Sequence, residues 1–590
     1  MIRHAVIVAV VAWSGAARAQ PGDVKALREA IAGIDEAVPT SVDAATKAAD
    51  ALGEQRAVVA MPELAGLIKR PASKKLLVAQ IAAIRALGKF DTAVDQVVPV
   101  LAPLIEKKYV QPANRAGEEA IAIQLGMAGA AINALGELHS AKAIPVLVPA
   151  LVNLPPLMMQ LRRAIVASGP TAVDELRKVL RGEHAKVEAM IRERKLGQYC
   201  GDANDRKQCQ PVNPRDFSTA IVLGDLRATK AVPELLAVLA RPPLPAYYVD
   251  EAPGPSTHIA VFDALRKIGS ADSAAKLRAI WSKPSAGVEL RAGAVAAYGF
   301  VATDASAVDE LGKIAADNAA DDNLRQEAAS AYARLARTPK HIPLLLDLAK
   351  KYLEASAKKR TEATALQPSR DAADAEFAKA RAKLDAQNAK LLAITRDPKS
   401  STDQIRAATA VTKQAQEDFT VSKQTHRNKL APFKGADNAA TAYLGFARMF
   451  QVHVARIEIA IRCRDEACFA SSLKLTEVAA ATQAATYLPD ATAWTKDHKM
   501  MLVEAYIDRG MLELARLKKV SAPTLDLLLD NMTSDNQVVR QAILLALPRL
   551  AVPPCPACVS KLDAAIKAAA GRTTLVERTV ETEILRNYFR

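Results

Sequence analysis

Apolar residues recur at helical spacing through most of the chain, in pairs of short runs that polar turns separate. The run from Ala79 reads AQIAAIRALGKFDTAVDQVVPVLAPLI, and the run from Gly129 reads GAAINALGELHSAKAIPVLVPALV. Leucines and valines at i, i+3 and i+4 predict helices with one apolar face, two in each run. Comparable runs begin at Ser218, Ala260, Leu290, Leu324 and Val538. Because a helix pair of this length cannot bury its apolar stripes alone, the repeats predict a stacked solenoid.

Glycine and proline mark the boundaries of these predicted helices. The first helix of a pair ends in several units near a glycine, at Gly88, Gly136, Gly224, Gly269 and Gly299. At each of these glycines we expect a left-handed helix cap. Pro145 and Pro233 fall early in the second helix, where a missing backbone N–H costs little.

The clearest version of the repeat is SDNQVVRQAILLAL, which begins at Ser534. It resembles the HEAT-repeat family, especially the bacterial short-repeat branch, with Asp535 expected to cap the helix and Arg540 one turn further in. Arg325 and Arg291 take the same arginine position in DDNLRQEAASAYARL and VELRAGAVAAYG. The resemblance implies an α-solenoid that serves as a scaffold or binding surface.

This resemblance covers most of residues 25–350 and 500–570. The alternatives are a non-repetitive helical bundle and a TPR-like array. The TPR aromatic signature is absent, although AYIDRGMLELARL, which begins at Ala505, has some TPR character.

The repeat pattern stops between Tyr352 and Lys434, where a seven-residue period replaces it. Residues at core spacing in the two successive runs are Ala373, Phe377, Ala380, Leu384, Leu391 and Ile394, then Ile405, Ala408, Thr412, Ala415 and Phe419. This period predicts two long helices folded back at Pro398 as an antiparallel coiled coil. A helix break is expected at Pro368, near the base of the hairpin.

The predicted fold class is therefore all-α, a HEAT-like helical-repeat solenoid interrupted by a long antiparallel coiled-coil hairpin. We expect four segments along the chain. A signal peptide occupies 1–19, an N-terminal HEAT-like solenoid 20–352, the hairpin 353–434, and a C-terminal HEAT-like solenoid 435–590.

The N-terminus, MIRHAVIVAVVAWSGAARAQ, has the three regions of a secretory signal peptide. Arg3 and His4 give a basic start, an apolar core follows, and Ala17-Arg18-Ala19 offers a small-x-small cleavage site. No later stretch approaches the roughly 20 apolar residues of a membrane span. We expect a periplasmic or secreted protein without a membrane span.

Charge and composition narrow the range of partners. Aromatic residues make up only 4% of the chain, which argues against a sugar-binding cleft or a base-stacking surface. The net charge is +15, and residues 355–434 alone hold 16 Lys/Arg and 9 Asp/Glu. Because an exported protein rarely meets nucleic acid, anionic envelope polymers or lipid headgroups are the expected counter-ions. A surface charge that only keeps the protein soluble is the plain alternative.

Six cysteines form three local pairs, Cys200/Cys209, Cys463/Cys468 and Cys555/Cys558, each at an expected turn. An even count, short spacing and an exported address predict three disulfides. Cys555 and Cys558 also form a C-x2-C, so a thiol-disulfide oxidoreductase is an alternative function. No strand pattern precedes that motif, as a thioredoxin-type centre would require. No histidine follows it for a haem, and zinc would need two further ligands.

No other catalytic or cofactor-binding motif occurs, and the eight histidines are scattered. We therefore expect no cofactor, no metal and no enzymatic activity. The stretch RPPLPAYYVDEAPGPST, from Arg241, is long for a solenoid turn, and its Tyr247, Tyr248 and Asp250 are candidate binding-loop residues. The tyrosines could instead cover the ends of adjacent helices. The sequence predicts a protein-binding scaffold or adaptor of the cell envelope, with anion binding by the basic hairpin as a further alternative.

Overall fold

The computed structural model describes residues 21–108, 115–200, 209–247, 254–303, 305–534, 536–569 and 576–590. Within these residues almost all regular structure is helical. The chain divides into two compact units. The first comprises Met1–Leu335, Arg464–Leu473 and Ile507–Arg590, and the second comprises Ala336–Cys463 and Lys474–Tyr506.

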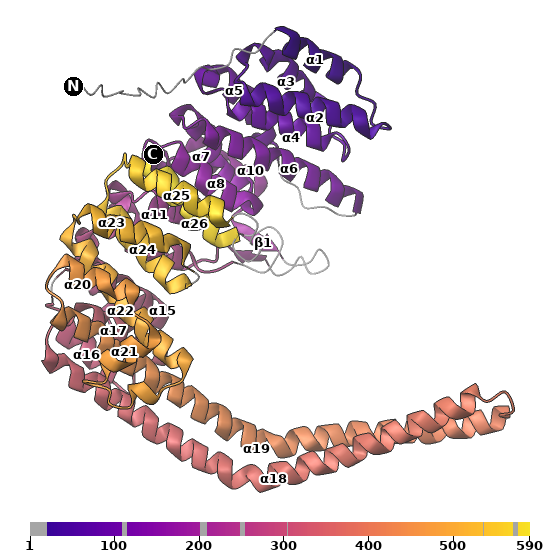
Figure 1. Ribbon diagram of the computed structural model, residues 1–590, viewed down its shortest axis with the longest axis vertical. Coiled ribbons are helices and arrows are strands. Elements are labelled where there is room, and N and C mark those ends of the chain that lie inside the picture. Colours follow the sequence, from indigo (N-terminus) through magenta and orange to yellow (C-terminus); the bar gives the residue numbers. More distant parts are fainter. Residues whose placement is uncertain are drawn as a thin grey trace, which may run out of the picture. The chain divides into compact units, whose positions relative to one another are not determined.

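The N-terminal part of the first unit is a stack of helix pairs (Figure 1). The pairs are α2 (Pro39–Glu54) with α3 (Met61–Lys69), α4 (Leu77–Gly88) with α5 (Val94–Glu106), α6 (Arg115–Glu137) with α7 (Ile144–Asn153), α8 (Met158–Ala167) with α9 (Ala172–Arg181), α11 (Asp216–Asp225) with α12 (Val232–Val238), α13 (Thr257–Ile268) with α14 (Ala274–Trp281), and α15 (Val288–Val301) with α16 (Val308–Ala316). Helix α1 (Pro21–Ala32) precedes the stack and α17 (Asp322–Leu335) ends it. Helix α10 (Ala185–Arg194) and a small antiparallel strand pair, β1 (Gln198–Cys200) and β2 (Cys209–Pro211), interrupt it.

The first helices of successive pairs pack side by side in one row, from α2 to α17. We call α2, α4, α6, α8, α11, α13, α15 and α17 the first-helix row. The buried core of the stack is aliphatic and alanine-rich, as the repeat pattern predicts. The predicted all-α solenoid fold is confirmed.

The glycines near the ends of these helices have a different role from the one the sequence predicts. Of the five glycines predicted to be left-handed caps, only Gly269 is one, with φ +66°. Gly88 lies inside α4, and a Cβ added there would lie 2.8 Å from the Cα atom of Ala134 in α6. Gly136, Gly224 and Gly299 make the same close approach to an alanine of the next first helix. The cap prediction is therefore wrong at these four glycines, because they allow neighbouring helices to touch.

The arginines of the HEAT-like motif bind carbonyl groups at the ends of preceding elements. The Nε atom of Arg291 donates to the Trp281 carbonyl at 3.0 Å, and that of Arg325 to the Ala315 carbonyl at 3.3 Å. Arg540 donates to the Ser534 carbonyl. Each arginine is the fourth residue of its helix. The same position in three repeats thus donates to carbonyl groups that have no backbone hydrogen-bond donor at the end of a helix or in a turn.

Helix boundaries otherwise follow the local sequence signals. Pro145 and Pro233 lie in the first turns of α7 and α12, as predicted. Asp535, the predicted cap of the Val538 repeat, lies outside the described residues. Asn536 caps that helix, and its side-chain oxygen accepts the Val538 N–H at 2.8 Å.

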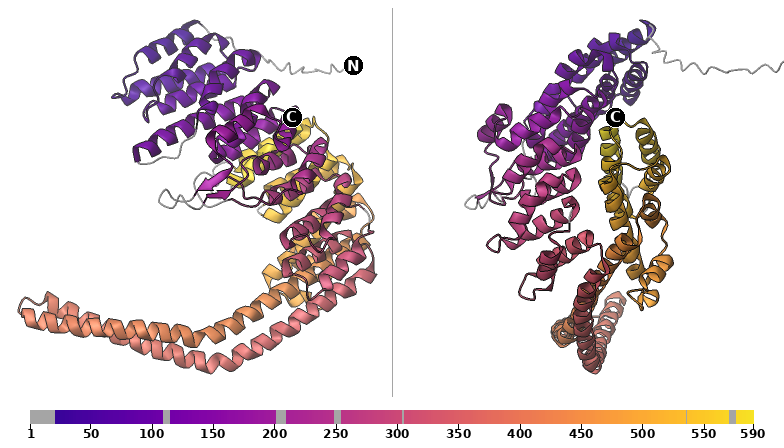
Figure 2. Two further views of the ribbon diagram at one scale, coloured as in Figure 1. Left: turned by 180° about the vertical axis from the view of Figure 1, so that it is seen from behind. Right: turned by 90° about the vertical axis from the view of Figure 1, so that its left-hand side faces the viewer.

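The C-terminal part of the first unit lies alongside the first-helix row (Figure 2). It contains α20 (Glu466–Ser471), the end of α22 (Lys496–Leu517), α23 (Ala522–Asp530), α24 (Gln537–Leu550), α25 (Pro556–Ala569) and α26 (Val576–Phe589). Helix α26 packs on α8 and α11. The repeat that begins at Val538 is thus a helix pair, α24 and α25, as predicted.

Arginines attach this C-terminal part to the carboxyl ends of the first-helix row. Arg549 Nη2 donates to the Arg266 carbonyl at 2.8 Å, at the end of α13. Arg516 Nη2 donates to the Ala302 carbonyl at 3.1 Å, directly after α15. Arg509 donates to a carbonyl near the end of α17, at 2.7 Å. A cation at a helix C-terminus meets the negative end of the helix dipole, so this row of contacts is favourable.

In the second unit, α18 (Ile342–Arg396) and α19 (Thr402–Arg462) form one long antiparallel helix pair (Figure 1). The chain reverses in a turn at Pro398, as predicted, and Ser401 with Gln404 forms a capping box at the start of α19. The phenyl rings of Phe377 and Phe419 stack with their centroids 5.3 Å apart. All of the predicted seam residues are buried or half-buried. The helices extend beyond the predicted 353–434 in both directions.

Pro368 does not break its helix, so the prediction of a break there is wrong. It lies inside α18, and Pro432 lies inside α19. The Arg370 guanidinium lies 5.0 Å from the centre of the Phe433 ring, which places the two prolines at a similar level of the pair. Both helices change direction part-way along their length (Figure 1). A proline inside a helix removes one hydrogen bond and bends the helix, which accounts for this.

Some helices of the stack are long and apolar enough to cross a membrane by length and composition. These are residues Gly117–Glu137 in α6 and the bent pair Ala141–Asn153 and Pro155–Ala167. Each packs against neighbouring helices of the solenoid, and core helices of globular proteins pass the same test.

Candidate functional site

A groove of about 940 Å³ opens on the N-terminal halves of α13, α15 and α17. We call it the α13–α17 groove. The end of α12 and the base of the long loop from Arg241 close one side of it. All of these residues belong to the first compact unit.

Small side chains on α15 create the hollow. Ala292, Gly293 and Ala296 line it, and none fills the space above the helix. The ring of Phe262 in α13 lies over Gly293, where an added Cβ would come within 2.3 Å of a ring carbon. Gly293 therefore makes room for the aromatic ring that lines the groove.

Apolar side chains on the groove wall are exposed to solvent. Ile259 in α13 is 59% exposed, and Val288 at the start of α15 is 42% exposed. Exposed aliphatic side chains beside a hollow are typical of a binding surface, because a partner that covers them gains hydrophobic free energy.

The charge of the groove rim is negative, in contrast to the basic chain. Glu289 and Glu327 line the groove, together with Asn323. The one lining arginine, Arg241, donates to Asp216 at 2.9 Å, so a buried carboxylate offsets its charge. The groove thus combines an apolar floor with two carboxylates.

The buried His258 is held neutral beneath the loop. Its Nε2 atom lies 3.1 Å from the Arg241 carbonyl oxygen, and this acceptor fixes the proton on Nε2. Burial lowers the pKa of His258, and the hydrogen bonds to the Arg241 and Val238 carbonyls oppose this only in part. This histidine therefore ties the base of the loop to α13.

The described ends of the loop from Arg241 are tied to the solenoid by backbone hydrogen bonds. Pro245 forms a bridge with Ser256, and Ala246 forms a bridge with Asn213, just after β2. Ser256 also caps α13, where its side chain accepts the His258 N–H at 3.3 Å. This anchoring fixes the wall of the groove.

Of the predicted binding-loop residues, only Tyr247 lies in the described part of the chain. Tyr247 is half-buried and does not line the α13–α17 groove, and its N–H donates to the Asn213 carbonyl at 3.2 Å. Tyr248 and Asp250 lie outside the described residues. Sequence reasoning found the loop but missed Ile259, Phe262 and Val288. The one indication in the sequence is Ile259, an apolar residue on the side of α13 that is otherwise polar.

Two of the predicted cysteine pairs lie at disulfide distance. The sulfur atoms of Cys200 and Cys209 are 1.98 Å apart, and those of Cys555 and Cys558 are 2.05 Å apart. Cys463 and Cys468 each take part in a disulfide, and no described cysteine is free. Cys558 is fully buried in α25. Cys555 is half-buried just before that helix, and its N–H donates to the Phe589 carbonyl at 2.9 Å.

Metal-binding groups do not cluster in the described part of the chain. No set of three or more His, Cys, Asp or Glu side chains there could hold a metal ion. The prediction that the protein uses no metal and no cofactor stays a prediction.

No protein-family model matches the chain, and no curated protein matches it. Among solved structures, the chain is similar to importin beta, in a crystal structure from an ammonium sulfate condition. The match has 10% sequence identity and a TM-score of 0.25, and covers 93% of this chain and 82% of that chain. A likeness at this TM-score carries no argument. The stacked helix pairs described above fit a HEAT-like repeat protein, and membership of that family stays a prediction.

Proposed function

We propose that the protein is a non-enzymatic protein-binding scaffold whose α13–α17 groove receives an apolar segment of a partner protein. The observation that carries this proposal is a groove of about 940 Å³ with exposed aliphatic walls and an acidic rim. Sites for small ligands span roughly 300–1,000 Å³. The groove is at the upper end of that range and lies along three helices, which suits a peptide segment better than a metabolite.

The charge on the rim narrows the chemistry of the partner segment. Glu289, which is exposed on the rim, would attract a lysine or arginine beside the apolar anchor. The anchor would contact Ile259, Phe262 and Val288 and would enter the hollow above Ala296. Helix-in-groove recognition of this kind needs only a short amphipathic segment.

The setting of the scaffold is proposed from the sequence. The signal-like N-terminus supports export to the periplasm or beyond. Disulfides at all six cysteines would suit an oxidising compartment. We therefore place the scaffold in the cell envelope.

Site-specific cross-linking tests the groove. A photo-reactive amino acid at Ile259 is compared with one at Val78, which is 57% exposed on α4 outside the groove. We expect the Ile259 probe to capture one defined protein in the source cells, and V288K to abolish the capture. The same products from both positions, or capture that V288K leaves unchanged, would contradict the proposal.

A second candidate function rests on the helix pair of the second unit. Lys379, Lys390, Lys413 and Lys423 are exposed and make no ion pair with the described residues. They support binding to anionic envelope polymers or lipid headgroups. Deletion of 356–433 should then abolish binding to anionic vesicles, and half-molar salt should do the same by screening. Binding that survives either treatment would exclude this function for the helix pair.

A further inference from the structure

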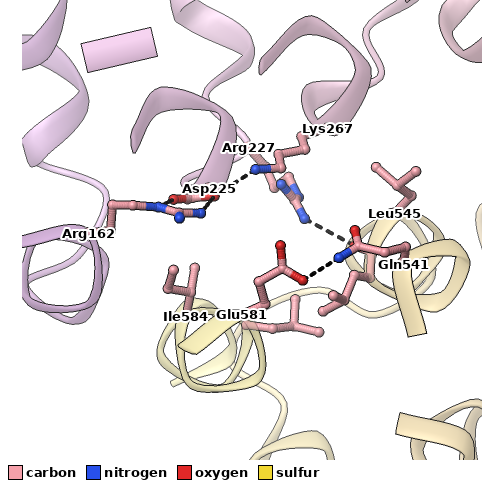
Figure 3. Close-up of a pocket in the computed structure, with 10 residues that line it drawn as sticks. Arg162, Asp225, Arg227, Lys267, Gln541, Leu545, Glu581 and Ile584 are labelled. Atoms are coloured by element: carbon pink, nitrogen blue, oxygen red, sulfur yellow. Dashed lines mark hydrogen bonds and ion pairs between the residues drawn. The ribbon is translucent and has the colours of Figure 1, made fainter. Parts of the chain in front are cut away.

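A small cavity of about 30 Å³ lies between the first-helix row and the C-terminal helices α24 and α26 (Figure 3). Arg162, Asp225, Arg227 and Lys267 approach it from the solenoid. Gln541 and Glu581 approach it from the C-terminal helices, and leucine and isoleucine side chains complete the wall. The whole cavity belongs to the first compact unit.

Asp225 is already shared by two of the three cations. It accepts from Arg162 Nε at 2.7 Å and lies 3.2 Å from Lys267 Nζ. Lys267 also pairs with Asp263, at 2.8 Å, and Asp263 in turn pairs with Arg266. The two carboxylates on the solenoid side, Asp225 and Asp263, therefore already have cations as partners.

Arg227 makes no ion pair with any described residue. Its guanidinium donates to the carbonyls of Gly224, at 2.6 Å, and Leu544, at 3.0 Å, and its buried Nε atom has no partner. Burial lowers the pKa of Arg227 from its ordinary value, yet an arginine stays charged in proteins. Arg227 is half-buried with a buried Nε atom, and a desolvated cation without a counter-ion is costly, so this position favours a negative charge nearby.

Glu581 is the one remaining carboxylate at the cavity. Gln541 donates to one of its oxygens, and the other oxygen faces the cavity (Figure 3). The lining then holds three cations and two carboxylates, which leaves one positive charge uncompensated.

We propose that the cavity binds one monovalent inorganic anion of the size of chloride, held by Arg227 and Lys267. The surplus of one positive charge matches a monovalent ion. The volume of about 30 Å³ exceeds the roughly 10–15 Å³ that one water molecule needs, so a monatomic ion fits. The anion would join the solenoid to the C-terminal helices, because both parts line its site.

Diffraction from crystals of the full chain grown in sodium bromide tests the site directly. We expect an anomalous peak in the cavity, within contact distance of the Arg227 and Lys267 nitrogens. A cavity that contains only water at saturating bromide would overturn the proposal, and this result does not depend on any variant.

Thermal unfolding in solution supplies a second readout, in sodium chloride against sodium gluconate at equal ionic strength. We expect chloride to raise the midpoint of the wild type, since a ligand that binds only the folded state stabilises it. R227M should lose this dependence. E581Q should lower the half-saturating chloride concentration by more than about tenfold, because it removes a like charge a few ångströms away.

The control is R85M in α4, which breaks an exposed ion pair with Asp50 of α2 and should keep the chloride dependence of the wild type. An equal chloride effect in the wild type, R227M and R85M would assign the effect to general salt screening and would overturn the proposal. If E581Q weakens the chloride effect, then Glu581 supports the site instead of opposing the anion, and the charge argument fails.

Discussion

The contact between Gly88 and Ala134 offers the sharpest test of how the solenoid is held together. In the substitution Gly88→Ala, the new Cβ would lie 2.8 Å from the Cα and 2.9 Å from the Cβ of Ala134. Carbon atoms in contact normally lie about 3.5–4.0 Å apart. The substitution therefore requires α4 and α6 to separate locally by roughly 1 Å.

The expected change in unfolding free energy for Gly88→Ala combines two opposing effects. Overpacking of this kind costs about 1–3 kcal/mol. Alanine gains up to about 1 kcal/mol over glycine inside a helix, and less at Gly88 because it is the last residue of α4. The net expected loss is about 1–2 kcal/mol of unfolding free energy.

The matched control is Gly66→Ala in α3, where an added Cβ would meet nothing within 4 Å. Helix propensity alone then acts, and the variant should gain about 0.5–1 kcal/mol. Urea unfolding followed by helical circular dichroism measures both, and an unchanged m-value shows that the surface exposed on unfolding is the same in each variant. If both substitutions shift the urea midpoint in the same direction, close helix contact does not explain why a glycine faces an alanine of the next first helix in several repeats of this chain.

Four further outcomes are expected. Gly293→Ala should displace the Phe262 ring and weaken partner capture at the groove. Gly66→Ala in α3, where a Cβ meets nothing within 4 Å, should leave capture intact. Equal capture by both variants would argue against the hollow as the anchor site. Burial raises the pKa of Asp263, but Lys267 and Arg266 more than offset this and lower it to about 2. Because that folded-state pKa lies below the usual value, the ionised carboxylate stabilises the fold above about pH 4 and loses this effect as the pH falls towards 2. Asp263→Asn should therefore lower the unfolding free energy by about 2 kcal/mol at pH 7 and by almost nothing at pH 2. Thiol titration of the native protein should find no free thiol. The disulfide of the buried Cys558 should persist in glutathione buffer. Rapid reduction of this disulfide by glutathione would favour the oxidoreductase alternative.

Local patterns predicted the elements well because they depend on near neighbours in the chain. The helix pairs follow from apolar spacing, and the seam of α18 and α19 follows from the seven-residue period at Phe377, Leu384 and Leu391. The position of the reversal at Pro398 was also predictable, since a turn signal separates the two periodic runs.

Features that depend on a distant partner were not predictable from pattern alone. A glycine near a helix end reads as a cap whether or not another helix touches it, so Gly88 and Gly269 look alike in sequence. The groove brings Ile259, Val288 and Asn323 together from three different helices, and no single run of sequence carries that signal. Similarly, nothing local indicates that the C-terminal helices pack on α8 and α11.

The attachment of those C-terminal helices has a consequence for the order in which the protein matures. Arg163 in α8 pairs with Glu583 in α26, and 420 positions of sequence separate them. While the chain is being synthesised, α8 can stack on α6, but its contact surface for α26 stays open until almost the whole sequence has been made. Folding of the first unit is therefore completed only after synthesis. A chain that stalls after the long helix pair would expose an apolar face to chaperones and proteases.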